Sequence, residues 1–378
     1  MTVRVAINGF GRIGRMVFRR LCEQTVSEVV AINASYPVET LAHLTQYDTV
    51  HGTFRHPVTA DGEFLCAGGQ RARIVNEREP DRLPWKALGV DVVIEATGQF
   101  RTRQGAARHL AAGAKKVLIT APGKEEDLTV VVGVNDHAYD DSKHHIVSNA
   151  SCTTNCLAPA VKVLHDSFGV EQLMMTTVHA FTSDQRSLDN PHKDLRRARA
   201  ATQAIVPTST GAAEAVAKVL PELEGRLTGM ALRVPTPNVS VVDVVADLKR
   251  DTDLTEIVNV YKQASAGEMK GIVDVCEAPL VSTDFVGNDH SAILDAGASM
   301  MLGKRKVKLL LWYDNEWGYS CRVVDMVQRM AGNWSSHSAS STSSIGSSDT
   351  SDSIDSTDRA SGTCCQQAQR EEKVPVTT

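Results

Sequence analysis

The chain has 378 residues, of which 40 are Lys or Arg and 45 are Asp or Glu, so its formal net charge is −5. Hydrophobic residues make up 42% and charged residues 22%, which are ordinary values for globular proteins. This balance excludes a predominantly disordered chain, a collagen-like fibre and a nucleic-acid binder that acts through net positive charge. The length predicts two domains, each large enough to bury its own core.

The first apolar run, Val3–Ile7, is interrupted by Arg4 and ends at Asn8, and no apolar run reaches the length of a membrane span. We therefore expect neither a spanning helix nor a signal peptide. Eight cysteines are too few for a disulfide scaffold in a chain of this length. A reducing, cytoplasmic environment is the expectation.

Up to about residue 150, short Val/Ile-rich runs alternate with Arg/Ala/Glu-rich helical stretches. The expected elements are Val3–Ile7, Arg12–Glu23, Val29–Asn33, Val90–Ala96, Arg103–Ala112, Lys116–Thr120 and Thr129–Val134. Such alternation predicts a doubly wound parallel sheet of the Rossmann type.

After this point the pattern changes to longer strands with few helices between them. The expected strands are Leu173–Ala180, Met230–Val234, Val239–Leu248 and Val307–Tyr313. They predict an α+β domain with a mainly antiparallel sheet. The expected domains are residues 1–150, rejoined by a helix at 318–332, and residues 151–317.

The segment 333–378 has a different composition, with thirteen serines between Ser335 and Ser361 and almost no large apolar residue. We expect it to be disordered because it cannot bury enough apolar surface to offset the entropy of ordering. Its adjacent Cys364 and Cys365 would close only a strained ring, so a regulatory disulfide is not expected.

The run Asn8–Gly14 contains G-x-G-x-x-G, directly after a predicted strand and at the start of a predicted helix. In that context Gly9, Gly11 and Gly14 predict a dinucleotide site, with the pyrophosphate at the helix N-terminus. The motif alone is also compatible with an ordinary glycine-rich turn.

A carboxylate is expected after the second strand of such a unit, where it binds the adenosine ribose. Here Asn33 is followed by Ala34 and Ser35, and no acidic residue occurs before Glu39. Because a carboxylate there would repel a 2′-phosphate, its absence favours NADP at least as much as NAD. In the alternative interpretation, backbone groups or Asn33 hold the ribose.

Cys152 is expected in the first turn of a helix, where the macrodipole favours a nucleophilic thiolate. Such a nucleophile needs a base, and His179 ends a predicted strand. Taken alone, Cys152 and Cys156 could be a buried free pair or a fragment of a metal site, and His179 an ordinary half-buried histidine. No complete metal-ligand pattern is present, so no metal is expected.

Six runs together resemble phosphorylating glyceraldehyde-3-phosphate dehydrogenase. They are NGFGRIGR, SNASCTTN, TTVHA, TSTGAA, LRVPTPNVS and WYDNEWGYS, in this order between residues 8 and 320. The resemblance implies that Cys152 attacks the aldehyde, that His179 acts as the base, and that inorganic phosphate cleaves the resulting thioester. It also implies a homotetramer.

The same resemblance implies two anion sites and a cofactor site. It assigns Thr182, Asp184 and Arg233 to the phosphate of glyceraldehyde 3-phosphate, and Ser151, Thr153, Thr210, Gly211 and Arg197 (or Arg196) to the attacking phosphate. It assigns Arg12 and Ile13 to the pyrophosphate, Arg78 and Thr97 to the adenosine, and Thr120, Asn315 and Tyr319 to the nicotinamide side.

Two departures concern the cofactor. Ala34 stands where NAD-preferring members carry Asp, and Asn190 stands before Pro191 where they tend to have an apolar residue. The run Ala31–Leu44 resembles the NADP-preferring, gluconeogenic bacterial branch. We therefore expect NADP to be preferred, with some use of NAD. The alternatives are an erythrose-4-phosphate dehydrogenase and a non-catalytic nucleotide-binding regulator, and no membrane or nucleic-acid partner is expected.

Overall fold

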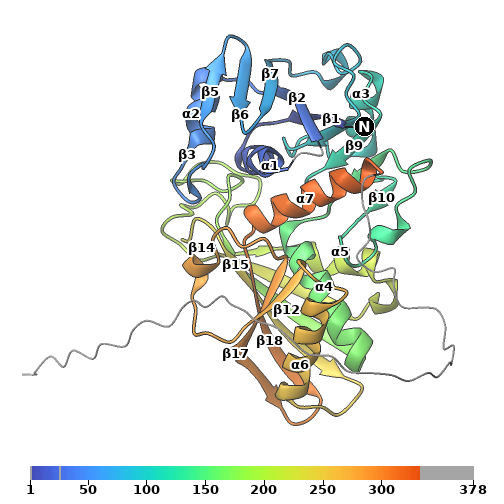
Figure 1. Ribbon diagram of the computed structural model, residues 1–378. Coiled ribbons are helices and arrows are strands. Elements are labelled where there is room, and N and C mark those ends of the chain that lie inside the picture. Colours follow the sequence, from blue (N-terminus) through green and yellow to red (C-terminus); the bar gives the residue numbers. More distant parts are fainter. Residues whose placement is uncertain (1, 25–26, 333–378) are drawn as a thin grey trace, which may run out of the picture. The chain divides into compact units, whose positions relative to one another are not determined.

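The computed structural model describes residues 2–24 and 27–332, which contain two large sheets (Figure 1). The first sheet has nine strands in the order β10-β11-β9-β8-β1-β2-β7-β6-β5. Their bounds are β1 Val3–Asn8, β2 Ser27–Asn33, β5 Val58–Asp61, β6 Phe64–Ala67, β7 Gln70–Val75, β8 Val92–Glu95, β9 Lys116–Ile119, β10 Leu128–Thr129 and β11 Ile146–Ser148. All strands from β10 to β7 pair in parallel, which confirms the predicted doubly wound sheet.

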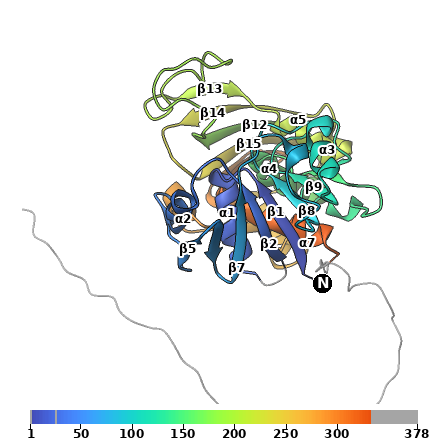
Figure 2. The same ribbon diagram turned by 90° about the horizontal axis from the view of Figure 1, so that it is seen from above.

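Helices α1 Arg12–Cys22, α2 Val38–Gln46 and α3 Arg103–Ala111 belong to this part of the chain. The chain order reverses at β1, with β2 on one side of it and β8 on the other (Figure 2). Ligands of doubly wound sheets bind at the carboxyl ends of the strands at such a switch point.

The second sheet has seven strands in the order β13-β14-β12-β15-β18-β17-β16. Their bounds are β12 Val170–Ala180, β13 Val206–Ser209, β14 Leu227–Val234, β15 Ser240–Leu248, β16 Val273–Cys276, β17 Ala292–Leu302 and β18 Lys306–Tyr313. The pairs β12–β14 and β16–β17 are parallel and the others antiparallel, as the sequence predicted for most of this sheet. Its core also contains α4 Cys152–Phe168, α5 Ala212–Val219 and α6 Leu254–Ala266.

Two details of the first sheet differ from the prediction. The strand predicted at Thr129–Val134 ends after Thr129, because the Asn135 side chain binds the backbone there: its Nδ2 donates to Thr129 O and its Oδ1 accepts from Val131 N, both at 2.9 Å. In addition, β5, β6 and β7 form an antiparallel addition that no sequence pattern had indicated.

Helix α7, Trp317–Met330, packs in the core of the first sheet although it follows the second sheet in sequence. Its apolar face includes Val323 and Val327, which lie in one buried cluster with Val5 and Phe18. By its packing, α7 therefore belongs to the core of the first sheet. The disorder predicted for 333–378, with Cys364 and Cys365, concerns residues outside the described part.

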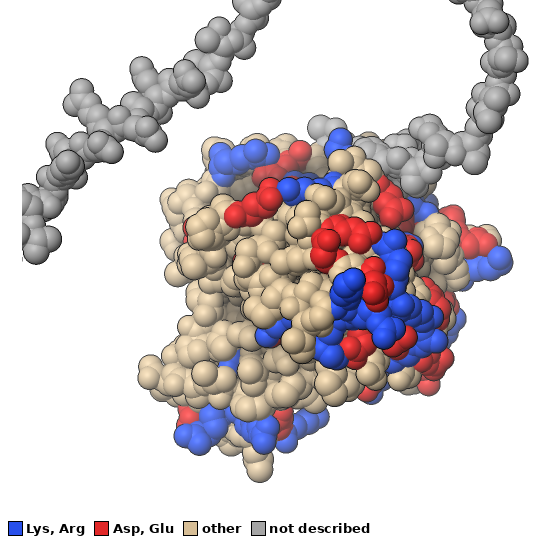
Figure 3. Space-filling model, turned by 90° about the horizontal axis from the view of Figure 1, so that it is seen from below, with Lys and Arg blue, Asp and Glu red and all other residues tan. Residues whose placement is uncertain are grey.

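In the described residues, no helix combines the length and the apolar composition that crossing a bilayer requires. On the face shown in Figure 3, basic and acidic side chains are interspersed. Among the exposed ion pairs of the described residues, Arg250 pairs with Glu256 at 2.8 Å.

The side chain of Arg12, at the start of α1, joins three segments that are distant in sequence. It pairs with Asp48 of β3 (Tyr47–Asp48) and, through its Nε at 2.8 Å, with Glu316 directly before α7. Burial alone would raise the pKa of both carboxyls, but the Arg12 guanidinium and nearby donors lower the pKa of each below its ordinary value. The two carboxylates therefore depend on Arg12.

We expect Arg12→Met to lower the free energy of unfolding at pH 7 by about 3–5 kcal/mol, since it leaves two buried carboxylates without their cation. Groups with depressed pKa values stabilise the fold above their unfolded pKa, so the difference from wild type should shrink as the pH falls below about 4. Urea unfolding at several pH values measures both effects.

Arg71→Met is the matched control, because Arg71 pairs with Asp61 at 3.0 Å where both side chains are more than half exposed. Its expected cost is below about 1 kcal/mol. Equal costs for the two substitutions would contradict the role of Arg12.

Candidate active site

A pocket of about 580 Å³ opens at the switch point of the first sheet. It lies beside the ends of β1, β2 and β8, so its position follows from the topology. Of the residues predicted to bind the cofactor, six line it: Gly9, Gly11, Ala34, Ser35, Arg78 and Thr97. The other lining residues include Asn33, which the sequence analysis named as an alternative for the ribose, and Arg15, Tyr36, Glu77 and Gln99, which it had not assigned to the site.

The three glycines of the motif have different surroundings, which a side chain at each position would meet differently. Gly9 has φ +96°, and a Cβ there would lie 2.8 Å from the backbone nitrogen of Thr97. A Cβ on Gly14 would lie 2.2 Å from the carbonyl oxygen of Gly9, so α1 packs against the loop only without a side chain. A Cβ on Gly11 would meet no atom within 4 Å, because this position faces the open pocket. The open space at a helix N-terminus fits a pyrophosphate.

A buried polar network lies beneath this pocket. Trp85 Nε1 donates to Nδ1 of His109 at 3.0 Å, so the ring proton of His109 is on Nε2, which faces Glu95 Oε2 at 3.0 Å. The Glu95 carboxylate also accepts hydrogen bonds from Asn8 Nδ2 and from the backbone of Thr97 at 2.9 Å. This network fixes the ends of β1 and β8, which carry pocket residues.

The Asn33 side chain is engaged by the protein itself. Its Nδ2 donates to Asn8 Oδ1 and to the Glu77 carbonyl oxygen, both at 2.7 Å, and its Oδ1 accepts from Glu77 N at 3.0 Å. These bonds occupy the amide protons and one acceptor site. The structure therefore does not favour the alternative in which this side chain holds the ribose.

The remaining predicted cofactor residues lie outside the lining of this pocket. The Arg12 side chain is held by Asp48 and Glu316, and Ile13 packs on the core of the first sheet. Thr120 follows β9 and donates from Oγ1 to the Glu95 carbonyl at 3.1 Å. Asn315 is buried just after β18 of the second sheet. Tyr319 is buried in α7, where its hydroxyl donates to Ala150 O at 3.0 Å.

Cys152 and His179, distant in sequence, face each other in the structure. Cys152 is the first residue of α4, after Ser151 as the N-cap, and His179 is the penultimate residue of β12. Cys152 Sγ lies 3.4 Å from His179 Nε2. His179 Nδ1 lies 2.7 Å from the Ala180 carbonyl oxygen, which accepts, and 2.7 Å from Arg233 Nη1, which donates. In the tautomer whose Nδ1 proton is donated to Ala180 O, Nε2 is the acceptor that faces the sulfur.

Burial determines the proton distribution in this pair. It raises the pKa of the Cys152 thiol, although the positive charge of Arg233 and hydrogen bonds from Thr153 oppose the rise. Burial and, to a smaller extent, the positive charge of Arg233 lower the pKa of His179 to about 3. Both shifts favour the neutral thiol and the neutral imidazole. The predicted influence of the helix N-terminus on Cys152 is smaller than the cost of desolvating a thiolate.

Two arginines surround the pair. Arg233 of β14 is the register partner of His179, and its Nη1 lies 3.0 Å from Ala180 O and 2.7 Å from His179 Nδ1. Arg197 contacts the Asp184 carboxylate and donates from Nε to Thr208 Oγ1 at 3.0 Å. Of the two candidate arginines, Arg197 is half-buried here, whereas Arg196 is exposed. Guanidinium groups in this arrangement suit phosphate groups.

The predicted phosphate-binding hydroxyls differ in their availability. Ser151 Oγ accepts from Thr154 N at 3.0 Å, and Thr153 Oγ1 lies 2.9 Å from the buried Tyr313 hydroxyl. Thr182 is half-buried after β12, and Thr210 with Gly211 begins α5, where Thr210 Oγ1 accepts from Ala212 N at 3.2 Å. The hydroxyls of Ser151, Thr153 and Thr210 thus each have a protein partner. Gly211, which has no side chain, is exposed.

Sequence reasoning missed Ser240 and Tyr313, which connect several site residues. Ser240 Oγ lies between Ala180 N and Asn315 Oδ1, and the Tyr313 hydroxyl lies 3.0 Å from Thr177 Oγ1. Both residues occur in the runs LRVPTPNVS and WYDNEWGYS, but neither run shows which side chains meet.

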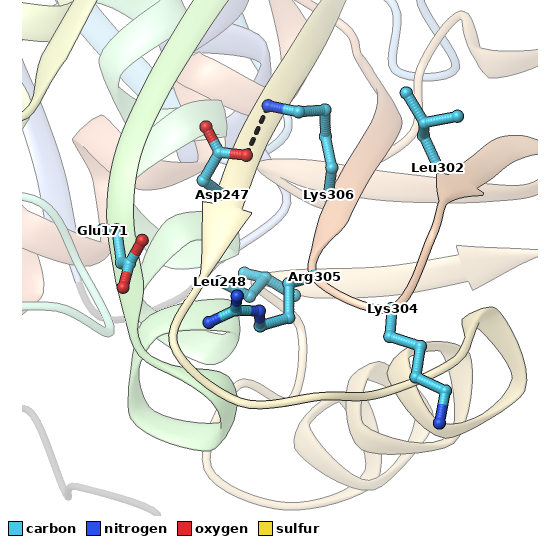
Figure 4. Close-up of a pocket in the computed structure, with 7 residues that line it drawn as sticks. All are labelled: Glu171, Asp247, Leu248, Leu302, Lys304, Arg305 and Lys306. Atoms are coloured by element: carbon cyan, nitrogen blue, oxygen red, sulfur yellow. Dashed lines mark hydrogen bonds and ion pairs between the residues drawn. The ribbon is translucent and has the colours of Figure 1, made fainter.

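In the part of the chain that the structure describes, no group of three or more His, Cys, Asp or Glu side chains could hold a metal. A second pocket, of about 310 Å³, lies at the end of the second sheet where β12 begins, opposite the end of that strand that carries His179 (Figure 4). Its lining contains no predicted site residue and consists of Glu171, Asp247, Leu248, Leu302, Lys304, Arg305 and Lys306.

Comparison with known proteins identifies the family. Residues 3–103 match the NAD-binding domain of glyceraldehyde 3-phosphate dehydrogenase, and residues 151–315 match the C-terminal domain of the same enzyme. The chain belongs to the glyceraldehyde-3-phosphate dehydrogenase family. It is accordingly an oxidoreductase with a nicotinamide-dinucleotide-binding domain.

Several curated relatives are similar over nearly their whole length. Glyceraldehyde-3-phosphate dehydrogenase 2 of Bacillus subtilis is 55% identical over 339 residues, covering 90% of this chain and all of the relative. The glyceraldehyde-3-phosphate dehydrogenase of Geobacillus stearothermophilus is 55% identical over 331 residues, covering 88% of this chain and 99% of the relative. Glyceraldehyde-3-phosphate dehydrogenase 2 of Trichormus variabilis is 53% identical over 335 residues, covering 88% of this chain and 99% of the relative.

The electrostatics of the pair predict how Cys152 reacts with iodoacetamide. Since the thiolate is the nucleophile and burial raises the thiol pKa, labelling should still accelerate above pH 9. Arg233→Gln removes the cation that opposes this rise, so we expect labelling at pH 8 to be about three to ten times slower. Peptide mass spectrometry follows Cys152 separately from the other cysteines.

Arg226→Gln is the control, because Arg226 directly precedes β14 and contacts the Val170 carbonyl instead of the site. It should label like wild type. Equal labelling of the Arg233 variant and wild type would show that Arg233 does not influence the thiol.

Proposed function

We propose that this chain oxidises D-glyceraldehyde 3-phosphate, with inorganic phosphate, reversibly to 1,3-bisphosphoglycerate while a nicotinamide dinucleotide is reduced. The observation that carries this proposal is the 3.4 Å approach of Cys152 Sγ to His179 Nε2 beside Arg233. The names of the curated relatives, all glyceraldehyde-3-phosphate dehydrogenases, support the substrate.

The residues have defined tasks in this reaction. His179 Nε2 takes the Cys152 proton as Sγ bonds to the aldehyde carbon, and it passes this proton to the former carbonyl oxygen, which gives a thiohemiacetal with a hydroxyl group. His179 then accepts the hydroxyl proton as the carbon is oxidised to a thioester. The dinucleotide, when bound, supplies the hydride acceptor. Attack of phosphate on the thioester carbon releases the acyl phosphate and returns the Cys152 sulfur.

The anion groups divide between two phosphates. Arg233 and Thr182, with Asp184, would position the phosphate of the substrate, and Arg197, Thr210 and Gly211 the attacking phosphate. The short contact of Arg197 with Asp184 joins the two groups and keeps the Arg197 guanidinium near the neutral His179. The Ser151 and Thr153 side chains have protein partners, so they would act through backbone N–H groups of the first turn of α4.

NADP is the cofactor that we propose as preferred. Ala34 and Ser35 line the pocket without a carboxylate at the end of β2, and the cation Arg78 lines the same wall. The one acidic residue of the lining, Glu77, accepts a hydrogen bond from Glu79 N at 2.9 Å. A guanidinium and a hydroxyl near Ala34 suit a 2′-phosphate.

Initial rates with glyceraldehyde 3-phosphate, phosphate and either NADP or NAD test the reaction and the cofactor together. We expect turnover with both cofactors and a higher kcat/KM with NADP. Ala34→Asp should lower kcat/KM with NADP at least about tenfold, because its carboxylate would face the 2′-phosphate. The neutral, isosteric Ala34→Asn is the control.

A preference of wild type for NAD would refute the role of Ala34 but not the reaction. Turnover of erythrose 4-phosphate in place of glyceraldehyde 3-phosphate would favour the related dehydrogenase. Binding without turnover of either substrate would favour a nucleotide-binding regulator.

We also propose that the chain forms a homotetramer, which would cover two apolar surfaces. One is the outward face of the second sheet, where Met174 is 68% and Leu302 74% exposed, next to the Asp247–Lys306 ion pair (Figure 4). The other is the loop 182–205, where Leu188 and Leu195 are 76% and 82% exposed. Two separate self-complementary surfaces are what a tetramer with two-fold axes requires.

We expect Met174→Asp to reduce the molar mass in light scattering from four chains to fewer, because an unpaired carboxylate would be buried in the contact. Leu44→Asp is the control, since Leu44 is an exposed leucine of α2, in the first sheet's part of the chain. An unchanged mass for Met174→Asp would exclude the sheet face as a contact.

A further inference from the structure

Ser240 is a buried hydroxyl that no step of the proposed reaction uses. It is the first residue of β15 and is 1% exposed. Its Oγ accepts a hydrogen bond from Ala180 N at 3.0 Å and lies 2.7 Å from Asn315 Oδ1. One side chain thus connects the end of the strand that carries His179 to Asn315, which is itself 5% exposed.

The hydroxyl determines which end of the Asn315 amide faces it. Ser240 has one proton, and its contact with Ala180 N uses a lone pair. With Asn315 Oδ1 toward Ser240, the proton is donated and both groups are satisfied. With the amide turned over, a buried hydroxyl proton would lose this acceptor, which costs free energy. The Asn315 NH₂ group is therefore directed away from Ser240, and it has no hydrogen-bond partner among residues 2–24 and 27–332.

The backbone before Ser240 supplies an independent observation. Val239 has φ +65°, in the left-handed region that β-branched residues rarely adopt, and it is 3% exposed. Such strain persists only where the surrounding structure imposes it, and it clusters at functional sites. Ala150, two residues before Cys152, is a second buried residue with positive φ, at +53°.

We propose that Ser240 is a positioning residue that presents the Asn315 NH₂ group to the carboxamide of the bound nicotinamide. The proposal rests on the proposed function, together with the family resemblance, which implies that Asn315 binds the nicotinamide side of the cofactor. A carboxamide oxygen is an acceptor, so it needs a donor, and an amide that turned freely would offer its oxygen half of the time. By donating to Asn315 Oδ1, Ser240 fixes the orientation of this amide before the dinucleotide binds.

Binding without turnover tests the proposal on the purified full chain. Calorimetry compares the dinucleotide that binds more tightly with the matching ligand that lacks nicotinamide, ADP-ribose for NAD or 2′-phospho-ADP-ribose for NADP. Ser240→Ala should weaken the dinucleotide about tenfold, the worth of about one hydrogen bond, and leave the truncated ligand unchanged. In an Asn315→Ala background the same substitution should have almost no further effect.

Two controls separate positioning from folding. Ser299→Ala removes another buried hydroxyl of the same sheet, which donates to Asp295 O at 2.6 Å, and should leave both affinities unchanged. Ser240→Thr and Ser240→Val have equal volume and differ in the hydroxyl. Thr should bind the dinucleotide more tightly than Val relative to the truncated ligand, even if Ser240→Ala does not fold.

Equal weakening of both ligands, no weakening, or an undiminished effect in the Asn315→Ala background would overturn the proposal. The proposal would also be overturned if Ser240→Thr and Ser240→Val had the same ratio of dinucleotide affinity to truncated-ligand affinity. Its failure is distinct from failure of the proposed function, because an inactive wild type that shows the expected binding ratios would contradict only the reaction.

Discussion

The connection from the first sheet into α4 is the constraint on which the active site depends. It runs through Ala150, a fully buried residue with φ +53°. Ser148 Oγ accepts from its N–H at 3.1 Å, and its carbonyl accepts the Tyr319 hydroxyl of α7 at 3.0 Å. These contacts hold a strained backbone immediately before the N-cap of α4. Cys152 consequently begins a helix whose first turn faces the end of β12, and its sulfur meets His179.

Burial shifts the pKa values of both Cys152 and His179. Desolvation disfavours the thiolate and the imidazolium alike, so it favours the neutral form of both partners. Arg233 acts on both groups, since its charge favours the thiolate and disfavours the imidazolium. A substrate phosphate near Arg233 would weaken both influences. Anion binding and base strength are therefore linked through one guanidinium.

The cofactor pocket depends in the same way on groups that do not face it. Glu95 and His109 are completely buried, yet they fix Asn8 and Thr97 at the pocket floor. The side chain of Arg12, a residue predicted to contact the pyrophosphate, secures α1 to Glu316, the residue after Asn315. Buried polar networks of this kind are stable only when every member has a partner, and that requirement makes the pocket rigid.

The sequence by itself determined the two sheet types, the dinucleotide motif after β1, the family and the identity of Cys152 and His179 as candidates, because these depend on local periodicity and on contiguous motifs. It did not determine the antiparallel addition β5–β7 or the end of β10, where the Asn135 side chain replaces the strand's hydrogen bonds. Only the tertiary structure decided that the Asn33 amide is occupied, that Ser240 joins Ala180 to Asn315, and that burial outweighs the helix N-terminus at Cys152. The physical reason is that hydrogen-bond partners and desolvation depend on residues brought together from different strands, and spacing along the chain does not contain that information.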